Sequence, residues 1–550
     1  MKIAYRPEID GLRGIAVIAV IFYHAQITIF GQNLLKGGFI GVDIFFVISG
    51  YLIASLILKE LKSTGKFSFA YFYERRARRL LPALFVVMLA SLPFAWIYLL
   101  PISFKDFANS ILSSIAFGSN FYFYYSGTLY GAESGLLKPF LHTWSLSVEE
   151  QFYLFFPIFL IICFRFFKKY LTHIIVVVFF ISLGIAEWGS HNYPSLNFYI
   201  LPTRGWELLA GVMLAKLESN NVRPSNRILN EIFILIGLIL IGYSIVFFHD
   251  EMLLPSFYTL CPIIGVMLII WFSNKEEFIT KILSSKFFVG VGLISYSLYL
   301  WHFPLFSFAR IKHPSISDYD KLEILFLTVV LSILTFFLIE KPFRNKNIIN
   351  KKVFISSIVL VIIFFISSYI LTIKTGGFEN RLHVFLKKEL KKNPWEILKD
   401  KNGLCFDRKD NHCSFNKKNK KKLFLIGDSQ AESISSEFFK KLKNKKINFV
   451  DMNRKGCFYL PYFDTIDKKT KKVVENCSED IQSNIRSELL SNKNSIVIIN
   501  ALYKEHLKKN GKYYLVNKKD NKTILNSFVN SLQYLLDNDF YIVLIYPIPE

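Results

Sequence analysis

The chain has 550 residues, of which 52% are hydrophobic and 17% aromatic, and its mean hydropathy is +0.35. This composition excludes an ordinary soluble enzyme and indicates a polytopic membrane protein with room for a second domain. The net charge of +24 would suit a nucleic-acid partner, but the lysines lie in short loops and in a Lys/Asn-rich C-terminal part, interleaved with acids. A positive-inside pattern explains this charge, and no nucleic-acid partner is expected.

Twelve apolar stretches approach the length of about 20 residues that crosses a ~30 Å hydrocarbon core. They lie at residues 9–30, 38–58, 80–100, 107–125, 146–167, 171–189, 202–217, 229–248, 255–272, 287–308, 321–339 and 353–373. The fourth is interrupted by Ser, Asn and Gly residues and is the weakest span. With a cytoplasmic N-terminus and no crossing by the fourth, the basic loops fall inside. The sequence therefore predicts about 11 spans, with the C-terminal part outside the cytoplasm.

The first apolar stretch carries Arg13 and His24 and is expected to be retained, because no small-residue cleavage site follows it. Eleven residues are close to three helical turns, so both side chains share one face, with His24 roughly 16 Å deeper and near mid-bilayer. Ionisable groups at such depth usually line a functional path. The alternative is an Arg that snorkels to the headgroups and a histidine satisfied within the core.

Arg76 and Arg79 have helical i, i+3 spacing before the third stretch, on the predicted cytoplasmic side. Such a pair can bind the phosphates of an acyl-coenzyme A, although ordinary positive-inside anchoring also explains arginines here. Glu149 and Glu150 enter the fifth stretch, where they either pair with a buried Arg or His or complement the helix dipole. His302, in the outer half of the tenth stretch, is a weaker candidate than His24 because an interfacial Trp-His pair is common.

Arg204 and Glu207 are expected to form an ion pair within one span. In the polar part, Cys405, Cys413, Cys457 and Cys477 suit two disulfides in an oxidising compartment. Pairing within each couple, Cys405–Cys413 and Cys457–Cys477, is the simplest of three connectivities. Zinc-type ligand spacing is absent from the sequence, so no metal site is expected.

After Gly376 and Gly377, a polar linker leads to a pattern of strand, tight turn and helix that contains Gly427-Asp428-Ser429. This turn would lift Ser429 to the carboxyl edge of a sheet, beside a helix N-terminus. A lone Gly-Asp-Ser is more often a turn or an N-cap. Further strands are predicted at 448–452, 495–499 and 541–546, with Gly456 and Asn500 following the first two.

Several motifs together resemble the acyltransferase-3 membrane family. They are Asp10-Gly11-Leu12-Arg13-Gly14, the spacing of Arg13 to His24, the run 41–52, Arg75-Arg76-x2-Arg79, the run 144–153 and the run 295–302. The resemblance covers residues 1 to about 345 and implies transfer of an acyl group, usually acetyl, from cytoplasmic acyl-CoA to an envelope glycan. It also implies essential roles for Arg13 and His24 and a donor-side role for Arg76 and Arg79.

The order of Gly-Asp-Ser, Gly456 and Asn500 after successive strands resembles an SGNH-type hydrolase domain. The resemblance implies that Ser429 is the nucleophile, and that its own amide, Gly456 and Asn500 are oxyanion donors. The Gly before Asn500 and the Asp after it are absent. So is the closing Asp-x2-His, since the sequence reaches Glu550 without it and His506 comes too early. We expect a truncated domain more than a non-catalytic one, because a missing last helix would expose apolar surface.

The predicted fold is thus a polytopic α-helical bundle followed by an α/β, flavodoxin-like, three-layer extracytoplasmic domain. Its parts are 1–345 (acyltransferase-3 domain), 346–377 (additional span), 378–420 (linker) and 421–550 (SGNH-like domain).

The expected function is O-acylation, with acetyl-CoA as donor substrate and no bound cofactor, of an envelope polysaccharide such as lipopolysaccharide or peptidoglycan. His24 acts as general base or acyl carrier, and Glu149, Glu150 and His302 are possible supports. The expected location is the bacterial inner membrane. A glycan-lipid flippase and a membrane-anchored carbohydrate esterase are the alternatives.

Overall fold

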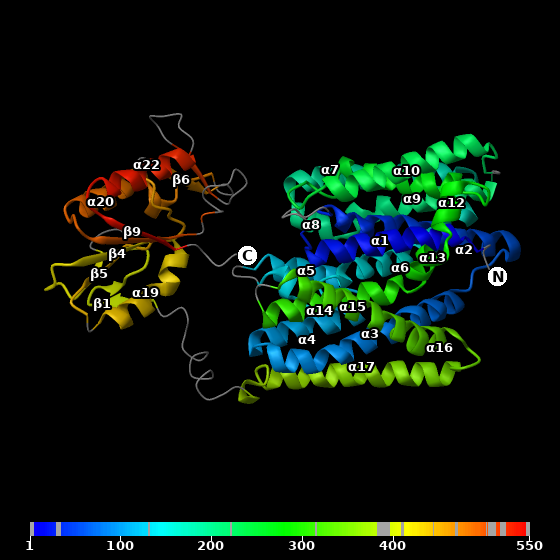
Figure 1. Ribbon diagram of the computed structural model, residues 1–550, viewed down its shortest axis with the longest axis horizontal. Coiled ribbons are helices and arrows are strands. Elements are labelled where there is room, and N and C mark those ends of the chain that lie inside the picture. Colours follow the sequence, from blue (N-terminus) through cyan, green and yellow to red (C-terminus); the bar gives the residue numbers. More distant parts are fainter. Residues whose placement is uncertain are drawn as a thin grey trace. The chain divides into compact units, whose positions relative to one another are not determined.

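A computed structural model describes residues 5–28, 35–129, 133–220, 223–313, 316–381, 397–408, 412–443, 445–461, 463–467, 471–501, 503, 513–516 and 524–545. His506 and the last five residues, 546–550, lie outside this set. The chain divides into two compact units, Met1–Glu379 and Asn380–Glu550. The first is a bundle of helices and the second contains a β-sheet (Figure 1).

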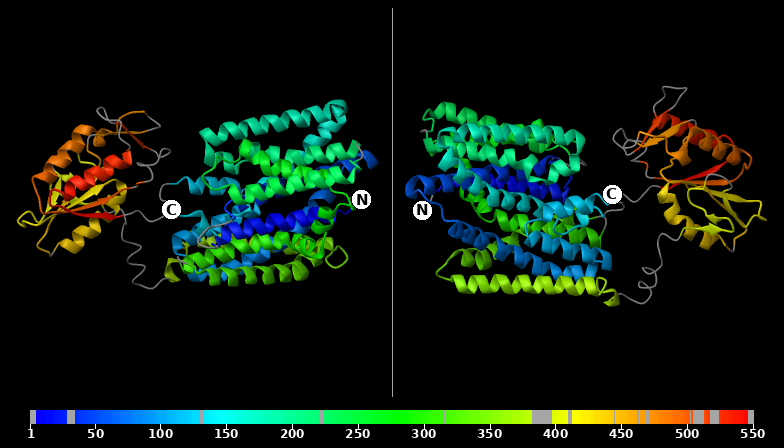
Figure 2. Two further views of the ribbon diagram at one scale, coloured as in Figure 1. Left: turned by 45° about the horizontal axis from the view of Figure 1, so that its top comes forward. Right: turned by 180° about the vertical axis from the view of Figure 1, so that it is seen from behind.

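Each of the twelve apolar stretches coincides with one or two helices of the first unit. The helices are α1 (Pro7–Ala25), α2 (Gly41–Thr64), α3 (Phe69–Tyr98), α4 (Pro101–Ile115), α5 (Ser119–Gly127), α6 (Thr143–Phe166), α7 (Leu171–Asn192), α8 (Pro194–Tyr199), α9 (Leu201–Asn220), α10 (Arg227–Phe247), α11 (Leu260–Phe272), α12 (Phe278–Leu283), α13 (Lys286–Leu293), α14 (Ser295–Lys312), α15 (Asp318–Thr335), α16 (Lys341–Arg344) and α17 (Lys351–Lys374). The longer helices run side by side (Figure 2), and α17 packs on α3 and α4 at the edge of the bundle.

Seven helices in the described part of the chain are long and apolar enough to cross a membrane, or eight if α13 and α14 form one span bent by 63°. Helices α1 and α9 each carry several charged residues, and α11 has only 13 residues. The protein is therefore a multi-pass membrane protein, while the count of eleven crossings stays a prediction.

The fourth apolar stretch is broken between α4 and α5, where Phe117 adopts a left-handed backbone conformation with φ of 51°. Buried hydroxyls tie this break to α6. Ser114 Oγ lies 2.7 Å from Thr143 Oγ1, which donates to Ser119 Oγ at 2.9 Å, and Ser119 Oγ lies 2.8 Å from Ser147 Oγ. Irregular backbone at membrane depth needs such protein partners, because lipid offers none.

Helices α2 and α9 approach each other closely at two glycines. A Cβ atom on Gly50 would lie 1.9 Å from the carbonyl oxygen of Leu208, and one on Gly211 would lie 2.0 Å from that of Val47. Membrane helices gain packing energy from such contacts because lipid supplies no hydrophobic drive between them.

An ion-pair triad is buried at the same interface. Arg204 on α9 pairs with Glu207 at 3.0 Å, within its own helix, and with Asp43 on α2 at 2.7 Å. All three side chains are at least 94% buried. The pair of Arg204 with Glu207 is the one expected from the spacing, whereas Asp43 was not expected as a partner.

The second unit is built on a five-stranded sheet with the order β3-β5-β4-β7-β9. Its strands are β3 (Cys413–Phe415), β4 (Lys422–Gly427), β5 (Asn448–Asp451), β7 (Ile496–Asn500) and β9 (Tyr541–Ile545), and only β3 is antiparallel to its neighbour. Two short antiparallel pairs accompany it, β1 (Lys399–Asp400) with β2 (Gly403–Leu404) and β6 (Asp464–Asp467) with β8 (Tyr513–Val516). This sheet confirms the predicted α/β fold.

Helices cover both faces of the sheet. Alternate residues of β4 divide between two apolar clusters, one with α20 (Glu479–Leu490) and α22 (Ile524–Leu536) and the other with α19 (Ser429–Leu442). Leu423 and Leu425 pack on the α19 side, and Phe424 and Ile426 on the other. The period of two along a strand, with both faces apolar, is typical of a strand buried between helix layers.

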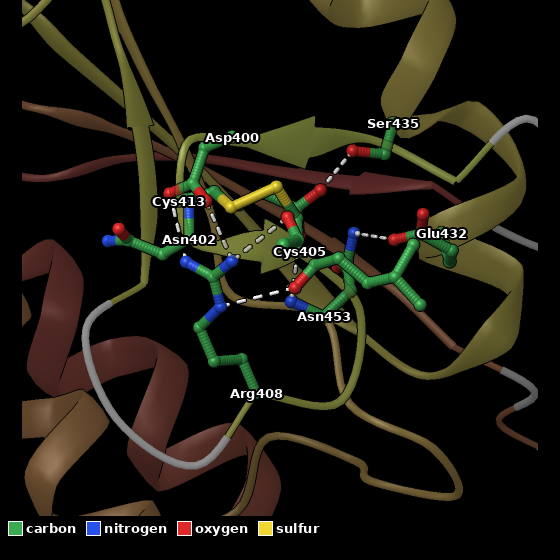
Figure 3. Close-up of a disulfide and its surroundings, with 11 residues drawn as sticks. Asp400, Asn402, Cys405, Arg408, Cys413, Glu432, Ser435 and Asn453 are labelled. Atoms are coloured by element: carbon green, nitrogen blue, oxygen red, sulfur yellow. Dashed lines mark hydrogen bonds and ion pairs between the residues drawn. A yellow bond between two sulfur atoms is a disulfide. The ribbon is translucent and has the colours of Figure 1, made fainter.

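Two disulfides lie in this unit, Cys405–Cys413 and Cys457–Cys477, and each joins cysteines that are neighbours along the chain. Beside the first, Arg408 binds both carboxylate oxygens of Asp400, at 2.8 and 2.9 Å (Figure 3).

Two buried acids lie nearby, Glu432 on α19 and Asp451 at the end of β5. Ser435 donates a hydrogen bond to Asp451, and the side-chain amide of Asn453 donates one to Glu432 at 3.5 Å. Burial, and then the charge of Asp451, raises the pKa of Glu432 to about 8. Burial also raises the pKa of Asp451 to about 6, against the hydrogen bond from Ser435.

Replacement of Gly50 by Ala is expected to lower the stability of the helical unit by about 1–3 kcal/mol, because the new methyl group meets the backbone of α9. The measurement is thermal unfolding of the full chain in detergent. Gly184→Ala on α7 is the matched control, since a Cβ there meets nothing within 4 Å. Equal unfolding temperatures for the two variants would contradict the close contact.

The raised pKa of Glu432 predicts that the second unit loses stability as pH rises. Between about pH 4.5, the ordinary value, and about pH 8, the folded state holds a proton that the unfolded state releases, so the free energy of unfolding falls with pH. We expect a loss of about 2–4 kcal/mol across this window. Glu432→Gln removes most of the slope.

Hydrogen exchange of α19 in the full chain at several pH values, corrected for intrinsic rates, measures this slope. Glu437→Gln on the exposed face of the same helix is the control and should keep the wild-type slope. A slope that Glu432→Gln leaves unchanged would show that the group responsible lies elsewhere.

Candidate functional site

The helical unit contains a cavity of about 290 Å³ between α1, α2, α3, α6 and α14. Apolar and aromatic side chains form much of its wall. Its charged lining residues are Arg13, Glu60, Arg75, Arg76, Arg79 and Glu149, and the hydroxyls of Ser145 and Tyr299 also line it. Four arginines against two acids make the cavity suited to an anionic ligand.

Arg76 and Arg79 both line the cavity, but their surroundings differ. Arg76 forms an ion pair with Glu150 at 2.5 Å, lies 3.8 Å from Glu149, and stacks over the ring of Tyr153 at 3.5 Å. Among the residues that the structure describes, none forms a hydrogen bond or ion pair with Arg79. The two arginines were expected to bind phosphate together. In the structure Arg76 is already paired with acids, and only Arg79 is available to a ligand.

Other cations surround Arg79. Arg13, Arg76 and Arg344 all act on it electrostatically. Arg13 is partly neutralised by Asp10, which lies one turn earlier on α1 at 3.1 Å. A half-buried guanidinium with cationic neighbours and no acid partner is a favourable position for a phosphate group.

Glu150, and at longer range Glu149, has the first of the two expected roles, pairing with a buried Arg. Glu150 pairs with Arg76, while Glu149 accepts hydrogen bonds from Ser49 at 2.6 Å and from Tyr153. These acids therefore join α6 to α2 and α3 around the cavity.

His24 lies in the last turn of α1, because the helix ends at Ala25 with Gln26 in a left-handed conformation. Helix α1 thus ends before the apolar run 9–30 does. His24 therefore lies at the end of the helix and not at its centre. The neighbouring Tyr23 hydroxyl donates to the exposed Asp250 at 2.6 Å, and Arg310 donates to the backbone carbonyl of His24.

His302 is the direct partner of His24. The His302 Nε2 atom lies 3.1 Å from His24 Nδ1, and its Nδ1 atom lies 3.2 Å from the carbonyl oxygen of Leu298. A carbonyl only accepts, so His302 carries its hydrogen on Nδ1 and its lone pair on Nε2. His24 must then donate from Nδ1, which leaves the lone pair of its Nε2 available as a base.

Tyr299 and Ser145 connect the cavity to this histidine pair. The Tyr299 ring is 5.4 Å from the His302 ring, and its hydroxyl lies 2.6 Å from Ser145 Oγ. Sequence reasoning did not assign either residue a role, although Tyr299 and His302 have the i, i+3 spacing of one helix face.

The second unit places Ser429 at the first position of α19, directly after β4. The Asp428 side chain caps this helix by accepting from the Gln430 amide at 2.8 Å. Gly427 allows the turn, because a Cβ there would lie 1.7 Å from the Asn500 carbonyl oxygen. A tight turn of this kind puts a serine at the carboxyl edge of a sheet, beside the positive end of a helix dipole.

Gly456 and Asn500 belong to the same edge. Asn500 ends β7 and pairs in register with Gly427. The loop after β5 returns to β4, since the Arg454 amide donates to the Gly427 carbonyl at 2.8 Å, and Gly456 follows with φ of 63°. The Asn500 Oδ1 atom is buried and has no hydrogen-bond partner among the described residues. The three predicted residues thus come from adjacent strand ends.

Comparisons with known proteins agree with this division. A family model described as an acyltransferase domain matches residues 6–371, and one described as an SGNH domain fused to such domains matches residues 399–550.

The chain is 33% identical over 370 residues to the peptidoglycan O-acetyltransferase OatA of Listeria monocytogenes, which covers 63% of this chain and 57% of that protein. It is 35% identical over 366 residues to a putative O-acetyltransferase of Staphylococcus aureus strain MSSA476, covering 63% and 58%. It is 31% identical over 473 residues to the O-acetyltransferase OatA of Staphylococcus aureus strain MRSA252, covering 81% and 76%. The chain thus spans less than two thirds of the first two relatives.

The acyltransferase model covers more than half of the chain, and the structure has a multi-pass helical unit followed by an α/β unit. The protein therefore belongs to the acyltransferase-3 family of membrane proteins and carries an SGNH domain after its helical unit.

Proposed function

We propose that the protein is an O-acetyltransferase that moves an acetyl group from cytoplasmic acetyl-CoA to hydroxyls of peptidoglycan outside the membrane. The acceptor is the one in the name of the Listeria relative, a peptidoglycan O-acetyltransferase. The orientation, with the N-terminus inside and the SGNH domain outside, follows the predicted distribution of basic loops. It also suits the two disulfides of the second unit, which form in oxidising compartments.

The observation that carries this proposal is the cavity with Arg79 in its wall and the His24–His302 pair beside its Tyr299 and Ser145 lining. Coenzyme A has phosphates at one end of a long arm and a thioester at the other. Arg79 holds the phosphates, the arm lies along the apolar wall, and the thioester lies near Tyr299. Arg76 keeps Glu149 and Glu150 in place around the donor.

His24 is the general base of the proposed transfer, through the lone pair on Nε2. Arg13, eleven residues earlier on the same helix, lines the donor cavity. The acetyl group reaches the glycan through Ser429, whose hydroxyl is acylated and then releases the group to the sugar. The Ser429 amide, Gly456 and Asn500 stabilise the oxyanion at this second step.

Arg79→Gln is expected to raise the KM for acetyl-CoA by about 10- to 100-fold, because a charge-assisted contact to phosphate is lost. The rate of CoA release by the purified full chain in lipid nanodiscs measures it. Arg165→Gln, an exposed arginine at the end of α6, is the control with an unchanged KM. A wild-type KM in Arg79→Gln would remove Arg79 from the donor site.

His24→Ala is expected to slow CoA release by about 10²- to 10⁴-fold, as loss of a general base does. Ser429→Ala should abolish O-acetyl transfer to a peptidoglycan fragment, followed by mass spectrometry, and leave only a slower CoA release in which water accepts the acetyl group. Ser487→Ala on the exposed face of α20 is the matched control. Full acetylation of peptidoglycan by His24→Ala would contradict the role of His24 as general base. Full acetylation by Ser429→Ala would contradict transfer through Ser429.

A further inference from the structure

His142, the residue directly before α6, is a buried histidine to which the proposed mechanism gives no role. It is 2% exposed, and neither of its ring nitrogens makes a hydrogen bond of normal distance and angle with the described residues, the backbone carbonyl of Leu300 offering only a weak contact. Buried polar groups are nearly always paired, because an unpaired one bears its full desolvation cost. We therefore expect the hydrogen-bond partner of this imidazole to come from outside the described chain.

The ring of His142 lies in the same aromatic cluster as His24. It stacks on Phe303 at 5.3 Å between centroids and lies 5.5 Å from His302 and 5.3 Å from Tyr299. His24 contacts two of these rings, Phe303 at 4.9 Å and His302 at 5.2 Å. The two histidines thus flank the same pair of rings, close to the Tyr299 side of the cavity.

The neighbours of His142 already have their own partners. Both nitrogens of His302 are engaged, by Leu298 and by His24. The Tyr299 hydroxyl donates to the backbone carbonyl of His142 at 2.8 Å and accepts from Ser145.

A metal is not indicated, because no group of three or more potential ligands in the described part of the chain has suitable geometry. If the only role of His142 were to stack on Phe303, phenylalanine at this position would serve equally well.

We propose that an N–H of His142 donates a hydrogen bond to the carbonyl oxygen of the acyl thioester and stabilises the oxyanion formed there. The inference rests on the proposed function. A carbonyl oxygen only accepts, which matches an imidazole N–H that makes no hydrogen bond of normal geometry with the described residues. The neighbouring contact with Tyr299, whose side chain lines the cavity, is consistent with a donor thioester reaching this ring.

The step balances without a further reactant. The acceptor hydroxyl oxygen attacks the thioester carbon while its proton passes to His24 Nε2, and the carbonyl oxygen becomes an oxyanion that accepts from His142. The C–S bond then breaks, the carbonyl re-forms, and the thiolate of coenzyme A takes the proton from His24. The products are the ester and free coenzyme A.

His142→Phe keeps the stacked ring and removes the N–H. In the full chain in nanodiscs, we expect kcat for CoA release to fall by about 10²- to 10³-fold, as for loss of one oxyanion donor, with the KM for acetyl-CoA nearly unchanged. His142→Gln, which restores an N–H donor, should recover part of kcat. His191→Phe is the matched control, since His191 is an exposed histidine on α7. It should behave as wild type.

Infrared spectroscopy of bound acetyl-CoA with a ¹³C-labelled carbonyl gives a second readout that a purely structural role would not change. The carbonyl band should shift to lower frequency in the wild type, and this shift should be lost in His142→Phe. If His142→Phe is not recovered folded, the wild-type band alone decides, because absence of the shift would overturn the inference.

Two further outcomes separate this inference from the proposed function. A wild-type chain that releases no CoA, or a His24→Ala chain as fast as wild type, would refute the proposed function itself. A His24-dependent wild type with an unimpaired His142→Phe variant, or one changed only in KM, would refute the role of His142 and leave the proposed function standing.

Discussion

The requirement that polar groups inside an apolar bundle find partners organises the helical unit. Lipid offers neither hydrogen bonds nor counter-ions, so a charge placed there is costly unless the protein pairs it. Arg204 is held by Asp43 and Glu207, and Arg76 by Glu149 and Glu150. The same requirement joins the broken α4–α5 region to α6 through shared hydroxyls.

Against this background, the polar groups without partners are informative. Arg79 has no hydrogen bond or ion pair within the described chain, although Arg76, three residues earlier on the same helix, lies within ion-pair distance of two acids. The imidazole of His142 is almost completely buried, yet it makes no hydrogen bond of normal geometry with the described residues. Arg79 lines the cavity and His142 contacts Tyr299 and His302, and for this reason both residues enter the proposed donor site.

The second unit follows a different constraint, the geometry of parallel strands. Strand ends that meet at one sheet edge bring Ser429, Gly456 and Asn500 together although more than 70 residues separate the first from the last. The disulfide at Cys405 and Cys413 lies in the same region as Glu432 (Figure 3), and Cys413 pairs in register with Asp451. Helix α19 carries both Ser429 at the candidate catalytic edge and Glu432, one of the buried acids.

The sequence alone determined the features that depend on local pattern. Apolar run length predicted the helices, alternating strands and turns predicted the α/β unit, and i, i+3 spacing predicted the pair of Arg204 with Glu207. Motif spacing also selected Arg13, His24, Ser429, Gly456 and Asn500, whose roles remain predictions.

Only the tertiary structure decided which long-range partners these residues have. The preference of Arg76 for Glu150, the contact of His24 with His302 and the isolation of Arg79 each depend on helices 70 or more residues apart. Local spacing carries no information on which faces of distant helices meet, because packing of the whole bundle sets those contacts.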